Sequence, residues 1–226
     1  ESVQEALSIL QNEFPLAIWE TFYVTILSTL FASIIGLPLG VLVTVGGRDG
    51  ILPLPKWLMT FLDVVINLLR SVPFLILMIM VIPLTRLIVG TPVGTVASIV
   101  PLTIAAFPFI ARLVESSLRE VSPNIIEAAQ SMGATPFQVI VKVLIPESVP
   151  SLISNGTIAI TTILGYSAMS GIIGGGGLGK IAINYGYYRY KTLVMILAVI
   201  LLIIMVQVFQ SLGTYLVKKL DRRSFD

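Results

Sequence analysis

Long apolar stretches, separated by short polar segments, dominate the chain and define the elements that it predicts. A membrane-spanning helix needs about 20 mostly apolar residues. Five stretches meet this requirement, at residues 18–45, 57–88, 93–117, 149–173 and 192–217. The pattern therefore predicts an all-α membrane protein with five transmembrane helices.

The second stretch is too long for one straight span, and it carries polar residues. Asp63, Asn67 and Arg70 are spaced i, i+4 and i+7, which places them on one face of a helix. We expect the first half of this stretch to lie against protein or at the membrane interface, and the crossing to begin near Val72. We interpret Asp63 and Arg70 as a buried pair that orders the helix, within a structural polar cluster that includes Asn67.

Residues 1–16 predict a short amphipathic helix ahead of the first span. Ser2 and Glu5 have the spacing of a capping box. The apolar stripe of this helix comprises Val3, Leu7, Leu10 and Phe14. The segment has no basic residue before an apolar core, so we expect no signal peptide here.

The charge content excludes a soluble fold. Of the 226 residues, 56% are hydrophobic and 12% are charged, whereas soluble domains carry about 25% charged residues. The chain has no histidine and no cysteine, which excludes zinc sites of the usual ligands, thiol nucleophiles, disulfides and histidine-based catalytic triads. The formal net charge of +2 is too small to indicate binding to nucleic acid.

Basic residues are distributed unequally between the two sides that five spans create. The side of the C-terminus holds Arg48, Lys56, Arg112, Arg119, Lys142, Lys218, Lys219, Arg222 and Arg223. The other side holds Arg86, Lys180, Arg189 and Lys191. Because cytoplasmic loops carry the excess of Lys and Arg, we predict that the N-terminus lies outside and the C-terminus in the cytoplasm.

A glycine run at residues 174–179, followed by Lys180, matches two nucleotide-binding patterns, G-x-x-x-x-G-K and G-x-G-x-x-G. Both patterns require a preceding strand. This run instead follows a predicted membrane helix, and Ile181 stands where a nucleotide site needs Ser or Thr. We therefore interpret the run as a flexible re-entrant or loop segment.

The first predicted span contains Gly36 and Gly40 in the pattern G-x-x-x-G. This spacing is typical of membrane helices whose backbones approach one another closely. We expect another helix to pack against the first span at these two glycines.

The loop between the third and fourth predicted spans, residues 122–146, is the most informative segment. Ser122 is a preferred N-cap residue, and Pro123 suits the first helical position. Gly133 suits the left-handed residue that ends a helix. These positions predict a short helix with defined ends, whose residues Ala128 and Ala129 would let another backbone approach closely.

A second short helix follows directly. Thr135 and Gln138 have capping-box spacing, and we expect this helix to run to Pro146. Two helices joined by a tight turn are also typical of DNA-binding proteins. However, Lys142 is the only basic residue from 123 to 146, which is too little charge to neutralise phosphates. We therefore interpret the pair as a docking element for another protein, with an ordinary packed loop as the alternative.

The same loop resembles the EAA signature of ABC importer permeases, whose usual form is EAA-x3-G-x9-I-x-L-P. The matching residues are Glu127-Ala128-Ala129, Gly133 and Val143-Leu144-Ile145-Pro146. Val143 and Ile145 replace the usual Ile and Leu, which are conservative changes. Further stretches, at 70–82, 109–115, 131–136 and 165–171, are similar to the methionine uptake permeases. The likeness extends from Ile18 to Val217.

The resemblance implies the type I ABC importer permease fold, as a single permease domain over residues 1–226. It implies a homodimer embedded in lipid in the bacterial cytoplasmic membrane, with two cytoplasmic ATPase subunits and an extracytoplasmic substrate-binding lipoprotein. The partner ATPase would bind ATP and Mg²⁺ and hydrolyse ATP, so we expect no cofactor and no enzymatic activity in this chain. A coupling helix would dock on that ATPase through Glu127, Ala128, Ala129, Met132, Gly133 and Ala134.

The fourth predicted span contains small, polar and polarisable side chains within an otherwise aliphatic helix. They are Tyr166, Ser167, Met169 and Ser170. We interpret them as a candidate translocation path and gate, because flexible thioether side chains suit loose contacts with the methionine that the resemblance implies. The alternative is that Tyr166 and Met169, three residues apart, pack the interface between two subunits.

Other functions remain open at this point. A related permease for another small polar solute would carry the same EAA signature. A secondary transporter that works alone often shows inverted repeats, and the odd number of spans with no visible repeat argues against it. A purely structural membrane subunit would not need the capped helix pair.

Overall fold

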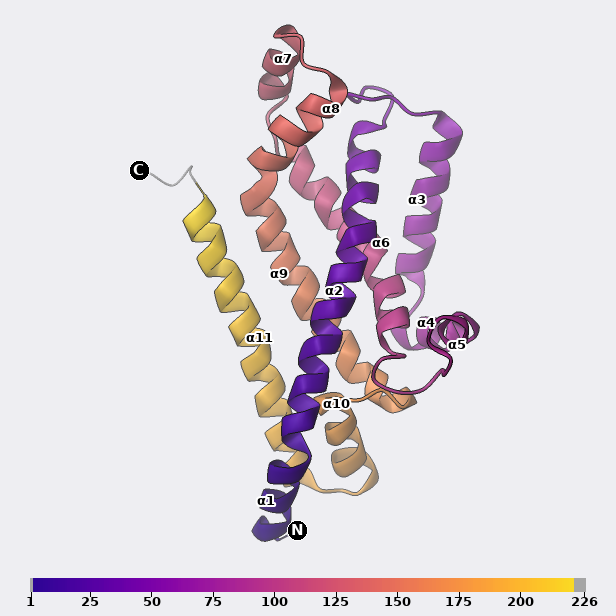
Figure 1. The fold of residues 1–226 in the computed structure, drawn as a ribbon, viewed down its shortest axis with the longest axis vertical. Coiled ribbons are helices and arrows are strands. Elements are labelled where there is room, and N and C mark those ends of the chain that lie inside the picture. Colours follow the sequence, from indigo (N-terminus) through magenta and orange to yellow (C-terminus); the bar gives the residue numbers. More distant parts are fainter. Residues whose placement is uncertain (1, 222–226) are drawn as a thin grey trace. The chain divides into compact units, whose positions relative to one another are not determined.

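The computed structural model describes residues 2–221, and this part of the chain is entirely helical (Figure 1). In chain order the helices are α1 Val3–Asn12, α2 Phe14–Val45, α3 Lys56–Ser71, α4 Phe74–Met80, α5 Ile82–Val89, α6 Ile99–Arg119, α7 Pro123–Ser131, α8 Pro136–Val139, the π-helix η1 Ile140–Leu144, α9 Ile145–Ser170, the 3₁₀-helix η2 Gly171–Ile173, α10 Leu178–Ile181, the π-helix η3 Ala182–Tyr188 and α11 Thr192–Leu220. Glu1 of the N-terminal segment lies outside the described residues, as do Arg222 and Arg223, which were counted above on the side of the C-terminus.

Four helical segments of the described chain are long and apolar enough to cross a membrane. They are Phe14–Val45, Ile99–Arg119, Pro136–Ile173 and Thr192–Leu220. A fifth span is present when the bent pair formed by α3 and α4 is counted as one. The predicted all-α membrane fold is thereby confirmed, with four or five candidate spans in the predicted order.

The second apolar stretch, residues 57–88, is broken where proline interrupts it. Helix α3 ends at Ser71, and Pro73 is the N-cap of α4. Proline disfavours helical backbone in the residue before it, so the helix breaks at Val72, where the sequence predicted a change. No straight crossing begins there, because α4 has 7 residues and α5 has 8.

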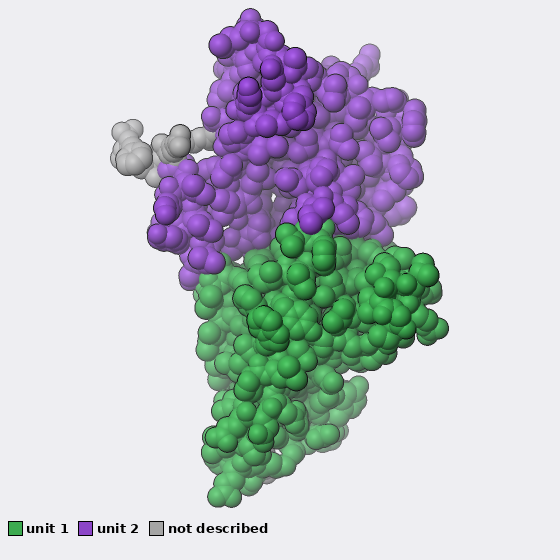
Figure 2. Space-filling view, viewed as in Figure 1, with its two compact units in different colours: residues 1–31, 72–106, 160–210 green, residues 32–71, 107–159, 211–226 purple. Residues whose placement is uncertain are grey.

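The chain forms two compact units (Figure 2). Unit 1 comprises residues 1–31, 72–106 and 160–210, and unit 2 comprises residues 32–71, 107–159 and 211–226, as far as they are described. Helices α2, α6, α9 and α11 each contribute residues to both units. The two units are treated separately below.

Helix α1 belongs to unit 1 and begins as its sequence predicts, because the Ser2 side chain accepts a hydrogen bond from the Glu5 N–H (3.2 Å). Its buried residues are Ala6 and Ile9, which pack in a cluster with residues of α10 and α11. The predicted apolar stripe is only partly correct, since Val3 is 65% exposed. The face of α1 that packs is formed by Ala6 and Ile9, with Leu10 of the predicted stripe beside them.

Unit 2 contains a second apolar cluster, in which α2, α3 and α6 meet. Val43, Ile66 and Ala111 are each at most 4% exposed and pack together. A Cβ atom added at Gly40 of α2 would lie 2.6 Å from the Val114 Cβ atom of α6. Because these helices touch backbone to side chain, the predicted close approach at the G-x-x-x-G pattern is confirmed.

Candidate functional site

The turn between α7 and α8 is built from complementary caps. The Ser122 hydroxyl accepts a hydrogen bond from the N–H at the start of α7 (3.3 Å), as predicted. Gly133 has φ of +83°, a conformation that glycine adopts at little cost. The Thr135 hydroxyl accepts from the Gln138 N–H (3.3 Å), and the Gln138 side chain accepts from the Thr135 N–H (3.0 Å). The turn is therefore held in one conformation from both sides.

The end of α7 has the complete hydrogen-bond pattern of a Schellman motif. The Gly133 N–H donates to the Gln130 carbonyl (3.0 Å), and the Ala134 N–H donates to the Ala129 carbonyl (3.1 Å). This pairing satisfies carbonyl groups that a helix end otherwise leaves to water. A backbone turn that is internally satisfied can present side chains to a partner without rearranging.

The six residues for which the resemblance implies a coupling role lie together on this turn. Glu127, Ala128 and Gly133 are exposed, and Ala129 and Ala134 are half-buried. Met132 is 88% exposed. The structure thus presents an apolar thioether surrounded by small residues, on a rigid support.

Phe137 extends the same exposed surface beyond the residues that the sequence singled out. Its side chain is 73% exposed, and it lies within the capping box that Thr135 and Gln138 form at the start of α8. A single exposed apolar side chain is unremarkable, but Met132 and Phe137 flank one rigid turn. The signal in the sequence was a phenylalanine directly after the helix-opening Pro136 in a polar loop.

The helix that follows this turn does not end at Pro146, which corrects the prediction. The chain continues without interruption from α8 through the π-helix η1 into α9, so that Pro136–Ile173 forms one helical segment. A proline inside an α-helix clashes with the carbonyl four residues earlier. A π turn at Ile140–Leu144 lies just before this proline, and π turns are among the irregularities with which a helix accommodates a local misfit. The capped turn is therefore continuous with a candidate span.

A groove of about 970 Å³ lies beside α7 in unit 2. It is lined by the loop that follows α2, by the end of α6 and by one face of α7. Its charged residues are Arg48, Asp49, Arg119 and Glu127. Sequence reasoning used Arg48 and Arg119 only in the count of basic residues and assigned them to no site, because the groove exists only once the three segments are folded together.

The polar cluster predicted on α3 has a different partner from the one expected. The Arg112 Nη2 atom of α6 donates to the Asp63 carboxylate and to the Asn67 side-chain oxygen, both at 3.0 Å. Arg70 is exposed at the end of α3, so the predicted buried pair of Asp63 with Arg70 is wrong. Seven residues of helix separate these two by about 10 Å along the axis, whereas Arg112 approaches Asp63 from a neighbouring helix.

The ion-pair network continues along α6. The Arg112 Nη1 atom donates to one Glu115 oxygen (2.8 Å), and the other Glu115 oxygen accepts from Arg119 (2.9 and 3.1 Å). The side chains of Arg112 and Glu115 are 21% and 16% exposed. Charged residues at 112, 115 and 119 in the last turns of an apolar helix are the signal that could have revealed the network.

The four candidate path residues of α9 do not form one cluster. The Ser167 and Ser170 side chains are buried, and their hydroxyls donate to carbonyls of their own helix, those of Leu164 and Ser167 (both 2.6 Å). The Tyr166 ring stacks on Phe74 with ring centroids 4.8 Å apart. The Met169 side chain is 39% exposed and is the member of the set that points away from the packed face.

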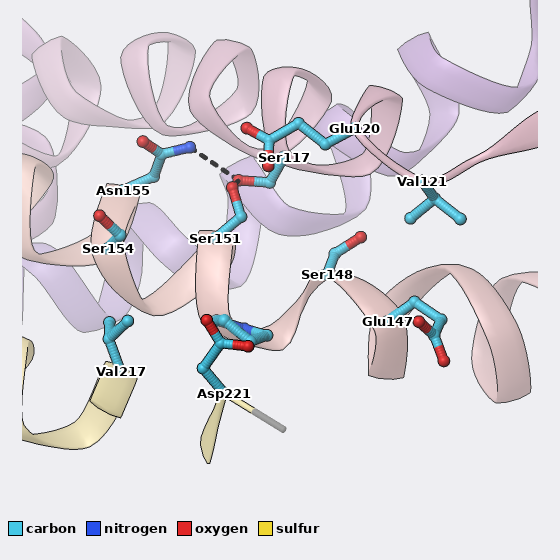
Figure 3. A pocket seen from close by; sticks show the side chains of 11 residues that line it. Ser117, Glu120, Val121, Glu147, Ser148, Ser151, Ser154, Asn155, Val217 and Asp221 are labelled. Atoms are coloured by element: carbon cyan, nitrogen blue, oxygen red, sulfur yellow. Dashed lines mark hydrogen bonds between the residues drawn. The ribbon is translucent and has the colours of Figure 1, made fainter. Parts of the chain in front are cut away.

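A cavity of about 370 Å³ in unit 2 was not predicted (Figure 3). The Ser117 hydroxyl accepts from the Ser151 hydroxyl (3.0 Å) and from the Asn155 amide (2.7 Å), which joins α6 to α9. The carboxylates that line the cavity are those of Glu120, Glu147 and Asp221. Hydroxyl and amide residues that recur at the start of an otherwise apolar helix were the signal for this seam.

The glycine run is a packed connection rather than a flexible segment. The Gly177 N–H donates to the Glu20 carboxylate (2.8 Å), and the Leu178 N–H donates to the Thr21 hydroxyl (2.9 Å). A Cβ atom added at Gly171 would lie 2.6 Å from the backbone nitrogen of Lys180. The Gly177 N–H already donates to the Glu20 carboxylate, so it cannot donate to a nucleotide phosphate. The two motif matches are therefore coincidental.

Comparison with known proteins matches residues 36–223 to the family described as binding-protein-dependent transport system inner membrane component. The probable D-methionine transport system permease protein MetI of Vibrio cholerae is 50% identical over 208 residues, 92% of each chain. The D-methionine transport system permease protein MetI of Escherichia coli K12 is 48% identical over 154 residues, 68% of this chain and 70% of that protein. A chain from inward-facing conformations of the MetNI methionine ABC transporter is 43% identical, with a TM-score of 0.90 over 98% of this chain and 100% of that one.

Proposed function

The chain belongs to the family of binding-protein-dependent transport system inner membrane components, and we propose that it forms the translocation path of an ATP-driven methionine importer in the bacterial cytoplasmic membrane. The chain is the permease component, and ATP hydrolysis belongs to a partner subunit. The observation that carries the proposal is the identity of 44–50% with methionine transport permeases over at least 90% of this chain.

The proposed complex contains two copies of this chain, two cytoplasmic ATPase subunits and an extracytoplasmic substrate-binding lipoprotein. ATP and Mg²⁺ bind to the ATPase subunits. Within this chain, residues 1–226 act as one permease domain, residues 1–16 form its N-terminal segment, and residues 122–146 form the segment that meets the ATPase. The relative named above as part of the MetNI methionine ABC transporter supports this assembly.

Coupling in this proposal depends on the rigidity of the turn after α7. The small residues Ala128, Ala129 and Gly133 allow the ATPase surface to approach the backbone, and Met132 inserts its exposed side chain into that surface. Because the turn satisfies its own hydrogen bonds, little conformational entropy is lost when it docks. Movement of the ATPase is then passed directly to α9, since the helix from Pro136 to Ile173 is continuous.

The proposed path runs along α9 past Met169. The Ser167 and Ser170 hydroxyls already donate to helix carbonyls, so they bind a passing amino acid only weakly. A thioether side chain makes loose contacts with another thioether. Weak contacts of this kind let the substrate leave the path, as import requires.

The proposed orientation has the N-terminus outside and the C-terminus in the cytoplasm. It is supported by the nine basic residues on one side against four on the other. In this orientation the capped turn after α7 faces the cytoplasmic ATPase, and the connection around α10 faces the substrate-binding protein.

The decisive experiment reconstitutes the purified chain with its ATPase in liposomes that carry the binding protein outside. We expect uptake of labelled methionine that requires ATP inside, and competition by unlabelled methionine but not by a panel of other amino acids. Uptake without the ATPase would indicate a secondary transporter and would contradict the proposal. If another solute competes more strongly than methionine, that solute and not methionine is the substrate.

Met169→Ala tests the path in the same liposomes. A gate residue predicts normal assembly and normal ATP hydrolysis with reduced methionine accumulation. A residue that only packs the subunit interface predicts a less stable complex and a parallel loss of both activities. Met80→Ala is the matched control, because Met80 is also exposed (55%) and lies outside the proposed path.

A further inference from the structure

We infer that Arg112 is a positioning residue for coupled transport. It holds α3 to α6, whose last residue lies close to the start of α7. Helices α3 and α6 would then move together with the coupling segment, residues 122–146. The inference rests on the proposed function, because it concerns how movement at the ATPase reaches the membrane. It assigns a role to the four-charge network in unit 2, which the EAA signature does not include. This network consists of Asp63, Arg112, Glu115 and Arg119.

The geometry of Arg112 is that of a clamp between two helices. One guanidinium nitrogen donates to both Asp63 and Asn67, which lie one turn apart on α3. The other terminal nitrogen donates to Glu115 on its own helix. A planar guanidinium can make these bonds at once, whereas the ammonium of a lysine presents a single nitrogen. The position therefore requires arginine for its full set of contacts.

The charges and their burial indicate that the network fixes the position of α3 relative to α6 and adds little to the free energy of unfolding. Two carboxylates, Asp63 and Glu115, face two guanidiniums, Arg112 and Arg119, so the formal charge of the four is zero. The middle pair is mostly buried, while Asp63 and Arg119 at its ends are 47% and 58% exposed. Desolvation cancels much of the attraction in buried ion pairs, and charges within membrane spans are usually retained for function.

The network ends where the coupling segment begins. Arg119 is the last residue of α6, and the N-cap of α7 is Ser122. The short connection is tight, because Val121 is buried and its N–H donates to the Leu118 carbonyl (3.3 Å). A displacement of α7 therefore moves the end of α6. Residues 72–98 separate α3 from α6 along the chain, so the two helices are held together by side-chain contacts, of which Arg112 makes the charged ones among the described residues.

Spin labels can test whether α3 and α6 move as one body. The chain has no cysteine, so Leu68→Cys on α3 and Ser116→Cys on α6, both at exposed positions, provide two specific sites. In the full complex with native Arg112, we expect the same label-to-label distance with and without trapped ATP. In Arg112→Gln we expect the distance to change or broaden on ATP trapping, and in Arg112→Lys an intermediate result.

Transport measured on the same variants connects this motion to function. We expect Arg112→Gln to lower methionine uptake per ATP hydrolysed by about fivefold or more, the low end of typical coupling between sites. Arg112→Lys should recover part of this ratio. Arg86→Gln removes an exposed arginine on α5 and should change neither measurement. If Arg112→Gln does not assemble, Asp63→Asn removes one charge while keeping the acceptor oxygen, and it should lower the ratio in the same direction.

The outcomes separate this inference from the proposed function. If the native complex shows no ATP-dependent methionine uptake, the proposed function fails. If the native complex transports and Arg112→Gln and Asp63→Asn keep the native uptake ratio, the inference is wrong. A change in the α3 to α6 distance in the native complex on ATP trapping would also overturn it.

Discussion

Replacing Gly40 with alanine should destabilise the protein through the contact between α2 and α6. The added Cβ atom would lie 2.6 Å from the Val114 Cβ atom and 2.7 Å from the Ala111 carbonyl oxygen. Carbon atoms in good contact are about 3.5–4.0 Å apart, so the two helices must separate by about 1 Å. The carbonyl oxygen belongs to the backbone, and a change of rotamer therefore cannot relieve the clash.

The expected magnitude follows from two opposing effects. Overpacking a tight contact costs about 1–3 kcal/mol, and alanine gains about 1 kcal/mol over glycine in helix propensity. Because the clash includes the backbone carbonyl of Ala111, we take the upper part of the overpacking range, about 2–3 kcal/mol, and the net loss of unfolding free energy at Gly40 is then about 1–2 kcal/mol. In a chain of this size each kcal/mol corresponds to about 2–4 °C in Tm, so thermal unfolding of the purified protein should shift down by about 2–8 °C.

Gly156→Ala is the matched control. Gly156 lies in α9, and its added Cβ would meet no heavy atom within 4 Å beyond its chain neighbours and the backbone of its own helix. The gain in helix propensity alone should then raise Tm slightly. An unchanged or raised Tm in Gly40→Ala, or equal shifts in both variants, would refute the close packing of α2 on α6.

Three further predictions concern the turn after α7, the orientation in the membrane and the docking of α1. Gly133→Val should weaken binding of the ATPase in a pull-down, because φ of +83° costs a residue with a Cβ about 1–2 kcal/mol, while Gly133→Asn should retain most binding; equal binding by both would contradict the role of the turn. Ser131→Cys and Asn184→Cys should each react with an impermeant thiol reagent from opposite sides of the membrane, Ser131→Cys from the cytoplasm, and labelling from one side would disprove the orientation. The pKa of Glu5 is lowered from 4.5 by a hydrogen bond from Lys191, so the contribution of this pair to the docking of α1 is present above that pH and is lost as the pH falls below it. Hydrogen exchange in α1 should reveal this loss in the native protein and not in Glu5→Gln.

The local features of the site could be predicted because they depend on residues close in sequence. The cap at Ser122, the left-handed Gly133 and the capping box at Thr135 each arise from side chains that bond to backbone within a few residues. The long apolar stretches are equally local, since each span is defined by its own composition. Such features need no knowledge of what packs against them.

The partner of Asp63 could not be predicted in this way. Its helix offered Arg70, but the contact is made by Arg112, which lies 49 residues away in sequence and on another helix. The same limit applies to Pro146, because a proline often ends a helix, whereas here the helix continues through it after a π turn, as α2 continues through Pro38 and α6 through Pro108. Contacts between helices and rare helix geometries depend on the packed molecule rather than on neighbouring residues.

The separation between Asp63 and its partner has a consequence for biogenesis. Synthesis proceeds at about 5–20 residues per second, so the 49 residues to Arg112 take about 2–10 s. During this interval α3 carries a carboxylate whose guanidinium has not yet been made. Insertion of an aspartate at the centre of a span through the translocon is unfavourable by about 2.5–3.5 kcal/mol.

Helix α3 is therefore a poor independent insertion unit, and its integration depends on a helix made after it. We expect α3 to remain at the translocon or at the headgroup level until α6 has emerged, and to integrate together with it. A nascent chain that stops before Arg112 would leave α3 exposed to membrane quality-control proteases. We therefore expect the ion pair to couple the order of synthesis to the order of membrane integration.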